Sequence, residues 1–478
     1  MGIGHSVNAS ARLALQFPSS TMASSLHDIL NSFLIPNPSD EETPFFIDET
    51  GQAVSRANAR AAVAAALARL RPVVSDTTVL ICSNSISFVA SFIAAALHFE
   101  CVVLASEEDA AHSARALGLD HLHVLTAREQ GLLTLTDDAM VPALRPHRRL
   151  RRIAYFTSGT TGSKKLLAFA PETLHRRLAD WTEYFGLPRG ATFLCTTTFA
   201  HSHGLNLHLL PALALRGTLM APRLDRLTTG TVAQLLRSRQ VSVFTAMPQF
   251  LDLLLRSPSA AGLSLADTLV VAGSDALRSS TKLAFEQRFG CQVRDQFGCA
   301  ETGPVALLHH EDDLRYMGES MTGREVAVLG ETASHLQIQV TSRSLCDEIW
   351  SDGVANVPTN PYLLADICAR NARGLYLRGR DRTVYEDQVS GRSIDLLQAE
   401  ASLEAQSYCE VVIIPHTCGS VTTLLCIVAS THQLPAADMQ ACLRESGLSA
   451  PADFVCRQAL LRTNLGKKVR HAASYGFD

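Results

Sequence analysis

Short hydrophobic runs alternate with helix-length segments along most of the chain. Residues 57–71 are rich in alanine and predict a helix, whereas residues 77–83 and 101–106 are short apolar runs that predict buried strands. Strands that alternate with helices predict an α/β fold, in which mainly parallel sheets are covered by helices. Similar strand-like runs occupy residues 121–126, 152–158, 191–198, 241–247 and 268–274.

The pattern changes toward the C-terminus. Residues 338–350 turn to short strands and turns, and the last section contains strand-like runs at 409–416 and 422–430 that suit a small α+β domain. We place the domain boundary at Gly379, Arg380 and Asp381. The predicted organisation is an extended N-terminal segment, a large domain and a small C-terminal domain, at residues 1–27, 28–379 and 380–478.

Composition narrows the class of protein. The chain has 478 residues, of which 47% are hydrophobic and 18% are charged, and its formal net charge is −4. These values are typical of a globular protein with a large core, and they favour neither nucleic acid nor an anionic membrane surface as a partner. The 12 cysteines form no C-x-x-C pair and predict reduced thiols in a cytoplasmic protein.

One apolar segment is relevant to membrane insertion. Residues 88–105 approach the length of a membrane span, but His98 and Glu100 interrupt them, and both side chains are costly in lipid. We therefore expect a buried helix followed by a buried strand, with no insertion into a membrane.

The segment YFTSGTTGSKK, residues 155–165, concentrates glycine, serine, threonine and lysine. Its small residues expose backbone N–H groups and hydroxyls that can surround oxyanions, and a lysine adds a point charge. The nucleoside-triphosphatase loop G-x-x-x-x-G-K-[ST] is different, because Gly159 and Gly162 are too close together and no G-K-[ST] follows them. The segment therefore predicts a phosphate-binding loop of another type.

This loop resembles the signature T-S-G-T-T-G-x-P-K-G of the adenylate-forming superfamily. That superfamily includes acyl- and aryl-CoA ligases, luciferases and peptide-synthetase adenylation domains. Lys165 occupies the position of the family lysine, while Lys164 replaces the proline and Leu166 the final glycine. The resemblance implies that the matching residues bind ATP phosphates, and these are Thr157, Ser158, Gly159, Thr160, Thr161 and Gly162.

Two further motifs follow in the order of that superfamily. QFGCAETG resembles Y-G-x-T-E-x-G, which implies that Phe297 stacks on adenine beside Gly298 and that Glu301 binds magnesium. The residue before the glutamate is alanine where the family usually has threonine, which removes one hydroxyl contact to phosphate. VVAGSDAL resembles the turn beside adenine and the acyl pocket, and it places Gly273 and Ser274 there.

The C-terminal motifs extend the resemblance over residues 28–470. YLLADICARNARGLYLRGRDR is similar to a T-G-D that is followed by G-R-x-D, with Ala365 in place of the glycine. It implies that Asp366 binds the ribose hydroxyls and that Arg380 lies beside it. RTNLGKKVR is similar to R-T-x-x-G-K-x-x-R, which makes Lys467 the catalytic lysine of a small domain that is mobile in the family.

The resemblance implies an AMP-forming ligase that uses ATP and Mg2+. A carboxylic acid would attack ATP to give an acyl-adenylate and pyrophosphate, while Lys165 and the loop draw charge toward the leaving group. Lys467 would bridge the acid and the nucleotide. A thiol would take the acyl group after the small domain rotates.

The motif FAHSHG indicates which class of acid is activated. It resembles F-H-x-x-G of acyl- and aryl-acid ligases and places His201 and Gly204 in the acid pocket, together with Gly273. Amino-acid-activating members use an aspartate in this region, yet no acidic residue lies between Ala191 and Pro222. An ammonium group would be unpaired there, at a high desolvation cost. We therefore expect a small-molecule acyl acid or an aryl acid such as a hydroxybenzoate.

The acceptor thiol belongs either to CoA or to the phosphopantetheine of an acyl carrier protein. After G-R-x-D, the segment leading to Gly391 and Glu400 is longer than in the family, and it contains the acidic residues Glu386 and Asp387. Added acids would repel the phosphates of free CoA, so we expect a carrier protein to be preferred. Two alternatives stay open: a catalytically impaired homologue that binds adenylate, and a ligase that transfers the acyl group to nitrogen or oxygen.

Overall fold

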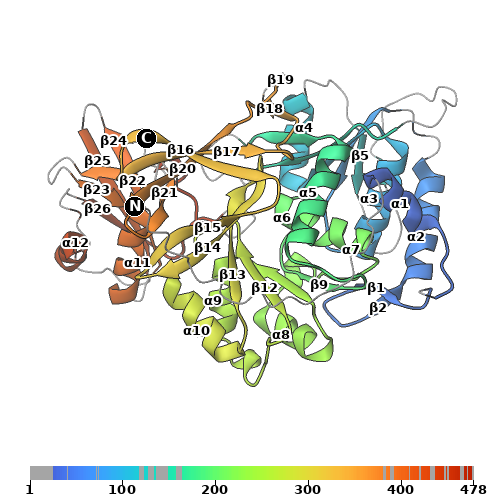
Figure 1. Cartoon of the computed structure of the whole chain (residues 1–478), viewed down its shortest axis with the longest axis horizontal. Coiled ribbons are helices and arrows are strands. Elements are labelled where there is room, and N and C mark those ends of the chain that lie inside the picture. Colours follow the sequence, from blue (N-terminus) through green and yellow to red (C-terminus); the bar gives the residue numbers. More distant parts are fainter. Residues whose placement is uncertain are drawn as a thin grey trace, which may run out of the picture.

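Figure 1 shows the whole chain as a computed structural model. The structure describes residues 25–475 except 40, 71–72, 74, 118–122, 127–133, 136–148, 158–163, 352, 381–383, 388–391, 408–409, 419–420, 431–435, 446–447, 449–451, 463–467 and 471.

The first large sheet has eight strands in the order β19-β18-β8-β7-β4-β3-β5-β6. Strands β7, β4, β3 and β5 run parallel, and antiparallel strands extend the sheet on both sides. Its strands are β3 (Thr77–Ile81), β4 (Cys101–Ala105), β5 (His123–Thr126), β6 (Thr134–Leu135), β7 (Arg152–Phe156), β8 (Leu166–Phe169), β18 (Glu348–Ser351) and β19 (Val354–Asn356).

The second large sheet has thirteen strands in the order β16-β17-β20-β21-β15-β14-β13-β12-β11-β9-β10-β1-β2. Strands from β13 to β1 in this order are parallel. They are β1 (Pro44–Ile47), β9 (Thr192–Cys195), β10 (Thr218–Met220), β11 (Val243–Ala246), β12 (Leu269–Gly273) and β13 (Val293–Cys299). The others are β2 (Ala53–Ser55), β14 (Gly303–Glu311), β15 (Leu314–Ser320), β16 (Arg324–Thr332), β17 (His335–Ser342), β20 (Tyr362–Asn371) and β21 (Gly374–Arg380).

Both sheets are therefore mixed, and each combines a block of adjacent parallel strands with antiparallel strands on either side. The antiparallel part follows from short connections, because parallel neighbours need a long crossover whereas a hairpin needs only a tight turn. Asp312 and Asp313 join β14 to β15 with positive φ angles of 49° and 59°, the backbone that a tight two-residue hairpin turn requires.

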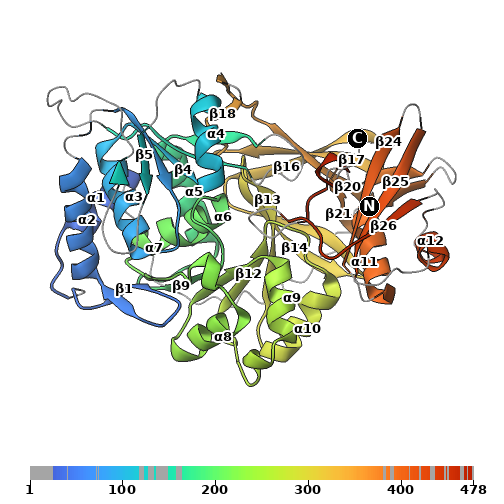
Figure 2. The same ribbon diagram turned by 180° about the vertical axis from the view of Figure 1, so that it is seen from behind.

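Helices cover both faces of the first sheet, as the alternation along β4 shows. Val102 and Leu104 belong to a core that also contains side chains of α2, α3 and α5, whereas Val103 and Ala105 pack on the opposite face with Ala116 of α4. Helices α8, α9 and α10 cover the outer face of the second sheet, and Figure 2 shows them together. The helices are α1 (Leu26–Leu34), α2 (Arg56–Leu70), α3 (Ile86–His98), α4 (Glu107–Leu117), α5 (Pro171–Tyr184), α6 (Ser202–Gly204), α7 (Leu210–Ala214), α8 (Thr229–Ser238), α9 (Pro248–Arg256) and α10 (Ser279–Phe289).

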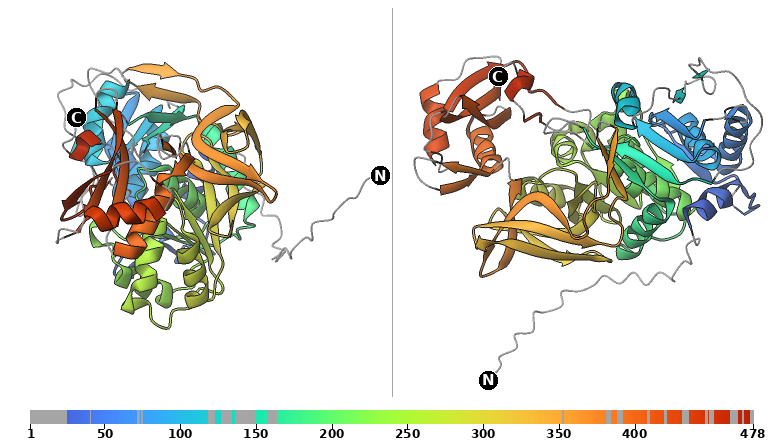
Figure 3. Two further views of the ribbon diagram at one scale, coloured as in Figure 1. Left: turned by 90° about the vertical axis from the view of Figure 1, so that its left-hand side faces the viewer. Right: turned by 90° about the horizontal axis from the view of Figure 1, so that it is seen from above.

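The C-terminal section forms a small α+β unit with its own core. Figure 3 shows it at one end of the molecule, beyond the hairpins of the second sheet. Arg278, just before α10, forms an ion pair with Glu404 of α11 and so connects the two parts. The elements are β22 (Val384–Asp387), β23 (Arg392–Asp395), α11 (Leu396–Ser407), β24 (Glu410–Cys418), β25 (Val421–Ala429), α12 (Ala436–Glu445) and β26 (Ala452–Arg457).

Two expectations about the N-terminal half can be compared with the fold. Residues 88–105 form the buried helix α3 followed by the buried strand β4, as predicted. Within the described ranges, no helix is both long and apolar enough to cross a membrane. Helix α1 begins at Leu26, inside the segment predicted to be extended, because the Ser25 hydroxyl accepts a hydrogen bond from the Asp28 N–H at 3.1 Å and caps the helix.

Candidate active site

The phosphate-loop motif connects the antiparallel strands β7 and β8. The Thr157 N–H donates to the Lys165 carbonyl at 2.8 Å, and the Lys165 N–H donates to the Thr157 hydroxyl at 3.1 Å. These bonds close the base of the loop and leave the Lys165 side chain exposed to solvent. The loop residues themselves, Ser158, Gly159, Thr160, Thr161 and Gly162, lie outside the described residues.

Lys164, which departs from the family proline, has a structural role in this fold. Its ammonium lies 2.6 Å from Asp109 Oδ1 and 3.4 Å from Glu108 Oε1, both in the first turn of α4. Asp109 is buried, and its backbone N–H donates to the Ser106 hydroxyl that caps the same helix. The ion pair therefore fixes the start of β8 against α4.

The magnesium motif lies in the tight connection between β13 and β14. A Cβ at Gly298 would come 2.3 Å from the Gly303 carbonyl oxygen, so the backbone leaves no room for a side chain there. Gly303 has a positive φ of 74°, and a Cβ there would come 3.0 Å from Arg177 Nε. Glu301 lies between these glycines and is half-buried. Phe297 is 7% exposed and belongs to a hydrophobic cluster with Val305 and Leu308, so its stacking on adenine stays a prediction.

The side chain of Arg177 on α5 holds the connection between β13 and β14 in place. The Arg177 side chain is buried, and it donates to the carbonyls of Ala300 at 2.9 Å, Glu301 at 2.8 Å and Ser344 at 2.6 Å. The same guanidinium donates to the hydroxyl of Tyr155 on β7 at 3.3 Å. Sequence analysis missed Arg177, because its partners are distant in the chain and no motif contains it.

Replacing Arg177 with methionine is expected to destabilise the protein by about 3 kcal/mol, since each buried carbonyl left unpaired costs about 1–3 kcal/mol. The shift of the urea unfolding midpoint measures this loss. The matched control is Arg176→Met on the same helix, because Arg176 is exposed and donates to a single carbonyl at 3.3 Å. We expect the control to change stability by about 0.5 kcal/mol or less, and equal losses in the two variants would contradict the role of Arg177.

Tyr362 is a second residue that sequence analysis missed. Its phenol lies near the carboxylate of Glu301, and burial and then the negative charge of Glu301 raise the pKa of the Tyr362 phenol. The phenol therefore stays protonated and can donate to the carboxylate. Tyr362 begins β20, four residues before Asp366, so this contact connects the metal motif to the strand of the ribose motif. The position of Tyr362 at the start of YLLAD was the only signal in the sequence.

The ribose motif is assembled by strand pairing. Asp366 of β20 and Arg380 of β21 are direct partners in the ladder, and Arg380 Nε lies 3.9 Å from Asp366 Oδ1. The structure therefore brings these two predicted residues together. The Asp366 side chain is 19% exposed, which leaves carboxylate surface accessible to a ligand.

The acid motif forms the short helix α6. His201 caps this helix by accepting the His203 N–H at 3.3 Å, and its side chain is buried. A Cβ at Gly204 would come 2.2 Å from the Thr198 carbonyl oxygen, which explains the glycine. Gly273 ends β12 opposite Gln296 of β13, and Ser274 follows it with a φ of 72°.

Lys467 lies outside the described residues, but the residues after it are anchored to the small domain. Lys468 Nζ lies 2.5 Å from Glu404 Oε1 and donates to the Val411 carbonyl at 2.6 Å. Arg470 Nη2 donates to Glu400 Oε2 at 2.7 Å. Gly391 lies outside the described residues, and Glu386 and Asp387 lie in β22.

The residues present fit a magnesium ion held mainly by a nucleotide. Among the described residues, no group of three or more histidine, cysteine, aspartate or glutamate side chains could hold a metal by itself. Mg2+ commonly binds through one or two carboxylates together with phosphate oxygens and water. The half-buried Glu301 would supply such a carboxylate. The cysteines that the structure describes are free thiols.

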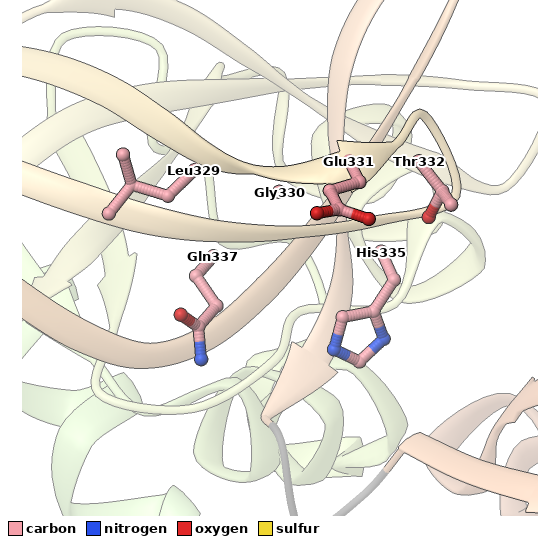
Figure 4. A pocket seen from close by; sticks show the side chains of 6 residues that line it. All are labelled: Leu329, Gly330, Glu331, Thr332, His335 and Gln337. Atoms are coloured by element: carbon pink, nitrogen blue, oxygen red, sulfur yellow. The ribbon is translucent and has the colours of Figure 1, made fainter.

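A surface pocket lies elsewhere, lined by residues of the β16–β17 hairpin (Figure 4). Among the described residues, none of those predicted for the active site lines it. Its lining consists of Leu329, Gly330, Glu331, Thr332, His335 and Gln337.

Comparison with known proteins agrees with the family resemblance of the sequence motifs. The family described as AMP-binding enzyme matches residues 102–341, about half of the chain. No curated protein sequence is significantly similar.

Solved structures share the fold over nearly the whole chain. The O-succinylbenzoate coenzyme A synthetase of Bacillus subtilis, solved with ATP and a magnesium ion, has a TM-score of 0.75 at 17% identity, over 92% of this chain and 98% of that one. ATP-bound MatB from Rhodopseudomonas palustris has a TM-score of 0.68 at 17% identity, over 93% and 97%. The amide bond synthetase McbA of Marinactinospora thermotolerans has a TM-score of 0.70 at 15% identity, over 95% and 100%.

Proposed function

This chain belongs to the AMP-binding enzyme family, and from that premise we propose that it joins a carboxylic acid to AMP and transfers the acyl group to a thiol. The acid is an aryl or acyl acid without an ammonium group. The thiol is that of an acyl carrier protein or of CoA. Released pyrophosphate is the second product of the first step.

One chain of hydrogen bonds supports this proposal most directly, because it connects three of the motifs. Arg177 binds the carbonyl of Glu301 and the hydroxyl of Tyr155, which lies on the strand leading into the phosphate loop. The Asn206 amide donates to the same Tyr155 hydroxyl at 3.1 Å and to the Ser202 hydroxyl of the acid motif at 3.1 Å. Phosphate, metal and acid motifs therefore meet around one buried cluster.

A second set of contacts links the loop to the metal motif from the other side. The Cys346 N–H donates to the Glu301 carbonyl at 2.8 Å, and the next N–H, that of Asp347, donates to Ala168 of β8 at 3.0 Å. Two adjacent residues thus join the metal motif to the strand that follows Lys165. An ion on the carboxylate of Glu301 and the ammonium of Lys165 can then approach the same phosphate chain.

These residues would serve adenylation by neutralising and aligning charge. A carboxylate that attacks the α-phosphorus of ATP is an anion approaching an anion, so positioned cations lower the barrier. Bound magnesium would supply positive charge next to Glu301. Asp366 would orient the ribose so that the α-phosphorus faces the acid, with Arg380 beside it. Lys165 would stabilise the departing pyrophosphate.

Acid-dependent exchange between ATP and labelled pyrophosphate tests the proposal. Exchange should appear with at least one member of a panel of aryl and aliphatic acids, and it should depend on Mg2+. Absence of exchange with every acid, while ATP still binds, would instead support the catalytically impaired homologue.

The molecule that accepts the acyl group is identified in a separate assay with the same enzyme. An acid that supports exchange is offered with free CoA, a panel of carrier proteins bearing phosphopantetheine, or simple amines. We expect carrier proteins to be acylated in preference to CoA. Efficient formation of acyl-CoA without loading of any carrier would contradict that preference. Amide formation alone would favour the nitrogen-acceptor alternative, which the fold shared with an amide bond synthetase keeps open.

A further inference from the structure

A chain of polar side chains runs from the core of the second sheet to the acid motif. His208 Nε2 lies 2.7 Å from the Thr245 hydroxyl, which lies 2.5 Å from His203 Nε2. His203 Nδ1 lies 3.0 Å from the Ser274 hydroxyl. His208, Thr245 and His203 are buried, whereas Ser274 is half-buried. The chain therefore has one buried end and one end that a ligand can reach.

The direction of these hydrogen bonds follows from the buried end. Burial lowers the pKa of His208 from 6.5 to about 3, a positive charge on His203 would act in the same direction, and the backbone carbonyls of His203 and Leu194 oppose both. His208 is therefore neutral and carries one N–H. Its Nδ1 lies 3.2 Å from the His203 carbonyl, which can only accept. Hence Nδ1 is the donor, and Nε2 of His208 accepts from the Thr245 hydroxyl.

The remaining bonds are then determined in turn. Because the Thr245 hydrogen points to His208, the Thr245 oxygen accepts from His203 Nε2–H. A neutral His203 ring has its second nitrogen, Nδ1, as an acceptor, so the Ser274 hydroxyl donates to it. The only hydrogen of the Ser274 hydroxyl is used in this bond. Ser274 can therefore offer a ligand only lone pairs.

The backbone of Ser274 indicates that its hydroxyl matters. Its φ of 72° lies in the left-handed region, which a residue with a Cβ rarely adopts and which glycine would adopt without strain. Strained residues of this kind persist where the surroundings over-determine them, often at ligand sites. Here the bond to His203 fixes the side chain, and His203 in turn belongs to the acid motif.

We propose that Ser274 contacts the acid and selects acids that carry a hydrogen-bond donor, such as a hydroxyl or amino substituent. This inference rests on the proposed function and assigns the Ser274 hydroxyl to the acid, whereas the resemblance placed Ser274 only in the turn beside adenine and the acyl pocket. An acid whose hydroxyl is replaced by a methyl ether presents only lone pairs to the Ser274 oxygen. That pairing leaves a partly buried acceptor unsatisfied, which disfavours binding.

Matched acid pairs in the ATP–pyrophosphate exchange assay test the inference. The probes are benzoate with its hydroxy, amino and methoxy derivatives at each ring position, and hexanoate with 6-hydroxyhexanoate. At the favoured position, kcat/KM for the hydroxy or amino acid should exceed that for the methoxy acid by about 10- to 100-fold.

Two variants of Ser274 separate the effect of losing the hydroxyl from the effect of relieving the backbone strain. Ser274→Ala keeps the left-handed strain and Ser274→Gly relieves it, but both remove the hydroxyl. Both should reduce the hydroxy-to-methoxy ratio to within about threefold of one and leave KM for ATP unchanged. Asp313→Gly is the control, because Asp313 also has a positive φ but lies in an exposed turn of the β14–β15 hairpin. It should leave the ratio as in the wild type.

Thr245→Val tests the assigned direction of the hydrogen bonds between His208, Thr245, His203 and Ser274. Without the Thr245 oxygen, His203 can carry its proton on Nδ1 and donate to Ser274, whose hydroxyl hydrogen then becomes available to a ligand. The variant should therefore lower the preference for hydroxy over methoxy acids by about tenfold, although Ser274 is intact. A purely structural role for Thr245 would change activity with all acids equally.

The outcomes separate the inference from the function on which it rests. If exchange occurs but hydroxy and methoxy acids react alike, the inference is wrong and the function stands. If the Ser274 variants raise KM for ATP and leave the acid ratio unchanged, the hydroxyl faces adenine and the inference is also wrong. If no acid supports exchange, the proposed function fails and the inference fails with it.

Discussion

Lys467→Ala is expected to slow adenylate formation by about 100- to 1,000-fold, the loss that follows removal of one group stabilising developing charge. The lysine ammonium would pair with the acid carboxylate and the nucleotide while these two anions react. Initial rates of ATP–pyrophosphate exchange at saturating acid measure the effect. Transfer of the acyl group from preformed acyl-adenylate to a thiol should be spared, because the lysine acts in the first step only.

Lys468→Ala is the matched control for this prediction. Lys468 is the adjacent lysine, and its ammonium is held by Glu404 and the Val411 carbonyl of the small domain. Its removal should weaken the anchoring of the C-terminal segment and lower stability, with a much smaller effect on the chemical step at low temperature. Exchange at a near wild-type rate in Lys467→Ala would remove that residue from the active site.

Glu301→Gln is expected to raise the Mg2+ concentration needed for half-maximal exchange. A neutral amide is a poor ligand for a hard cation. The change should reach at least the roughly 10- to 100-fold loss of metal affinity that follows removal of a supporting residue at a metal site. Mg2+ titrations of the exchange rate at saturating ATP and acid measure it. Glu325→Gln, on the exposed surface of β16, makes the same change in net charge and should have no such effect.

Tyr362→Phe removes a polar neighbour of the Glu301 carboxylate. The phenylalanine keeps the shape of the ring and removes the hydroxyl that lies near Glu301 and can donate to it. Its Mg2+ requirement should fall between those of the wild type and Glu301→Gln, because the ligand is present but less well oriented. An unchanged Mg2+ requirement in both variants would show that Glu301 holds no metal.

The sequence by itself determined the parts of this protein that depend on local pattern. The alternation of buried strands and helices is visible in short windows, so β3, β4, β7, β9, β11 and β12 were all predicted at their observed places. Steric demands on single positions are also visible in the sequence. A glycine such as Gly298 or Gly204 stands where nearby backbone leaves no room for a side chain. The motif residues Glu301, Asp366 and Arg380 could be proposed as site residues in the same way, since their order and spacing along the chain match those of the family motifs; their roles stay predictions.

Tertiary structure decided the contacts between residues that are distant in sequence. Arg177 reaches carbonyls more than 120 positions away, with sequence separations of 123 and 124, and no window of the sequence contains both partners. Lys164 and Asp109, Tyr362 and Glu301, and Ser274 and His203 are further pairs of this kind. Each member alone is an ordinary polar residue, and its role exists only when the fold buries it against its partner. The periodic burial that selects helices and strands is a local property, whereas the hydrogen bonds that orient this site depend on how the strands are ordered in the two sheets.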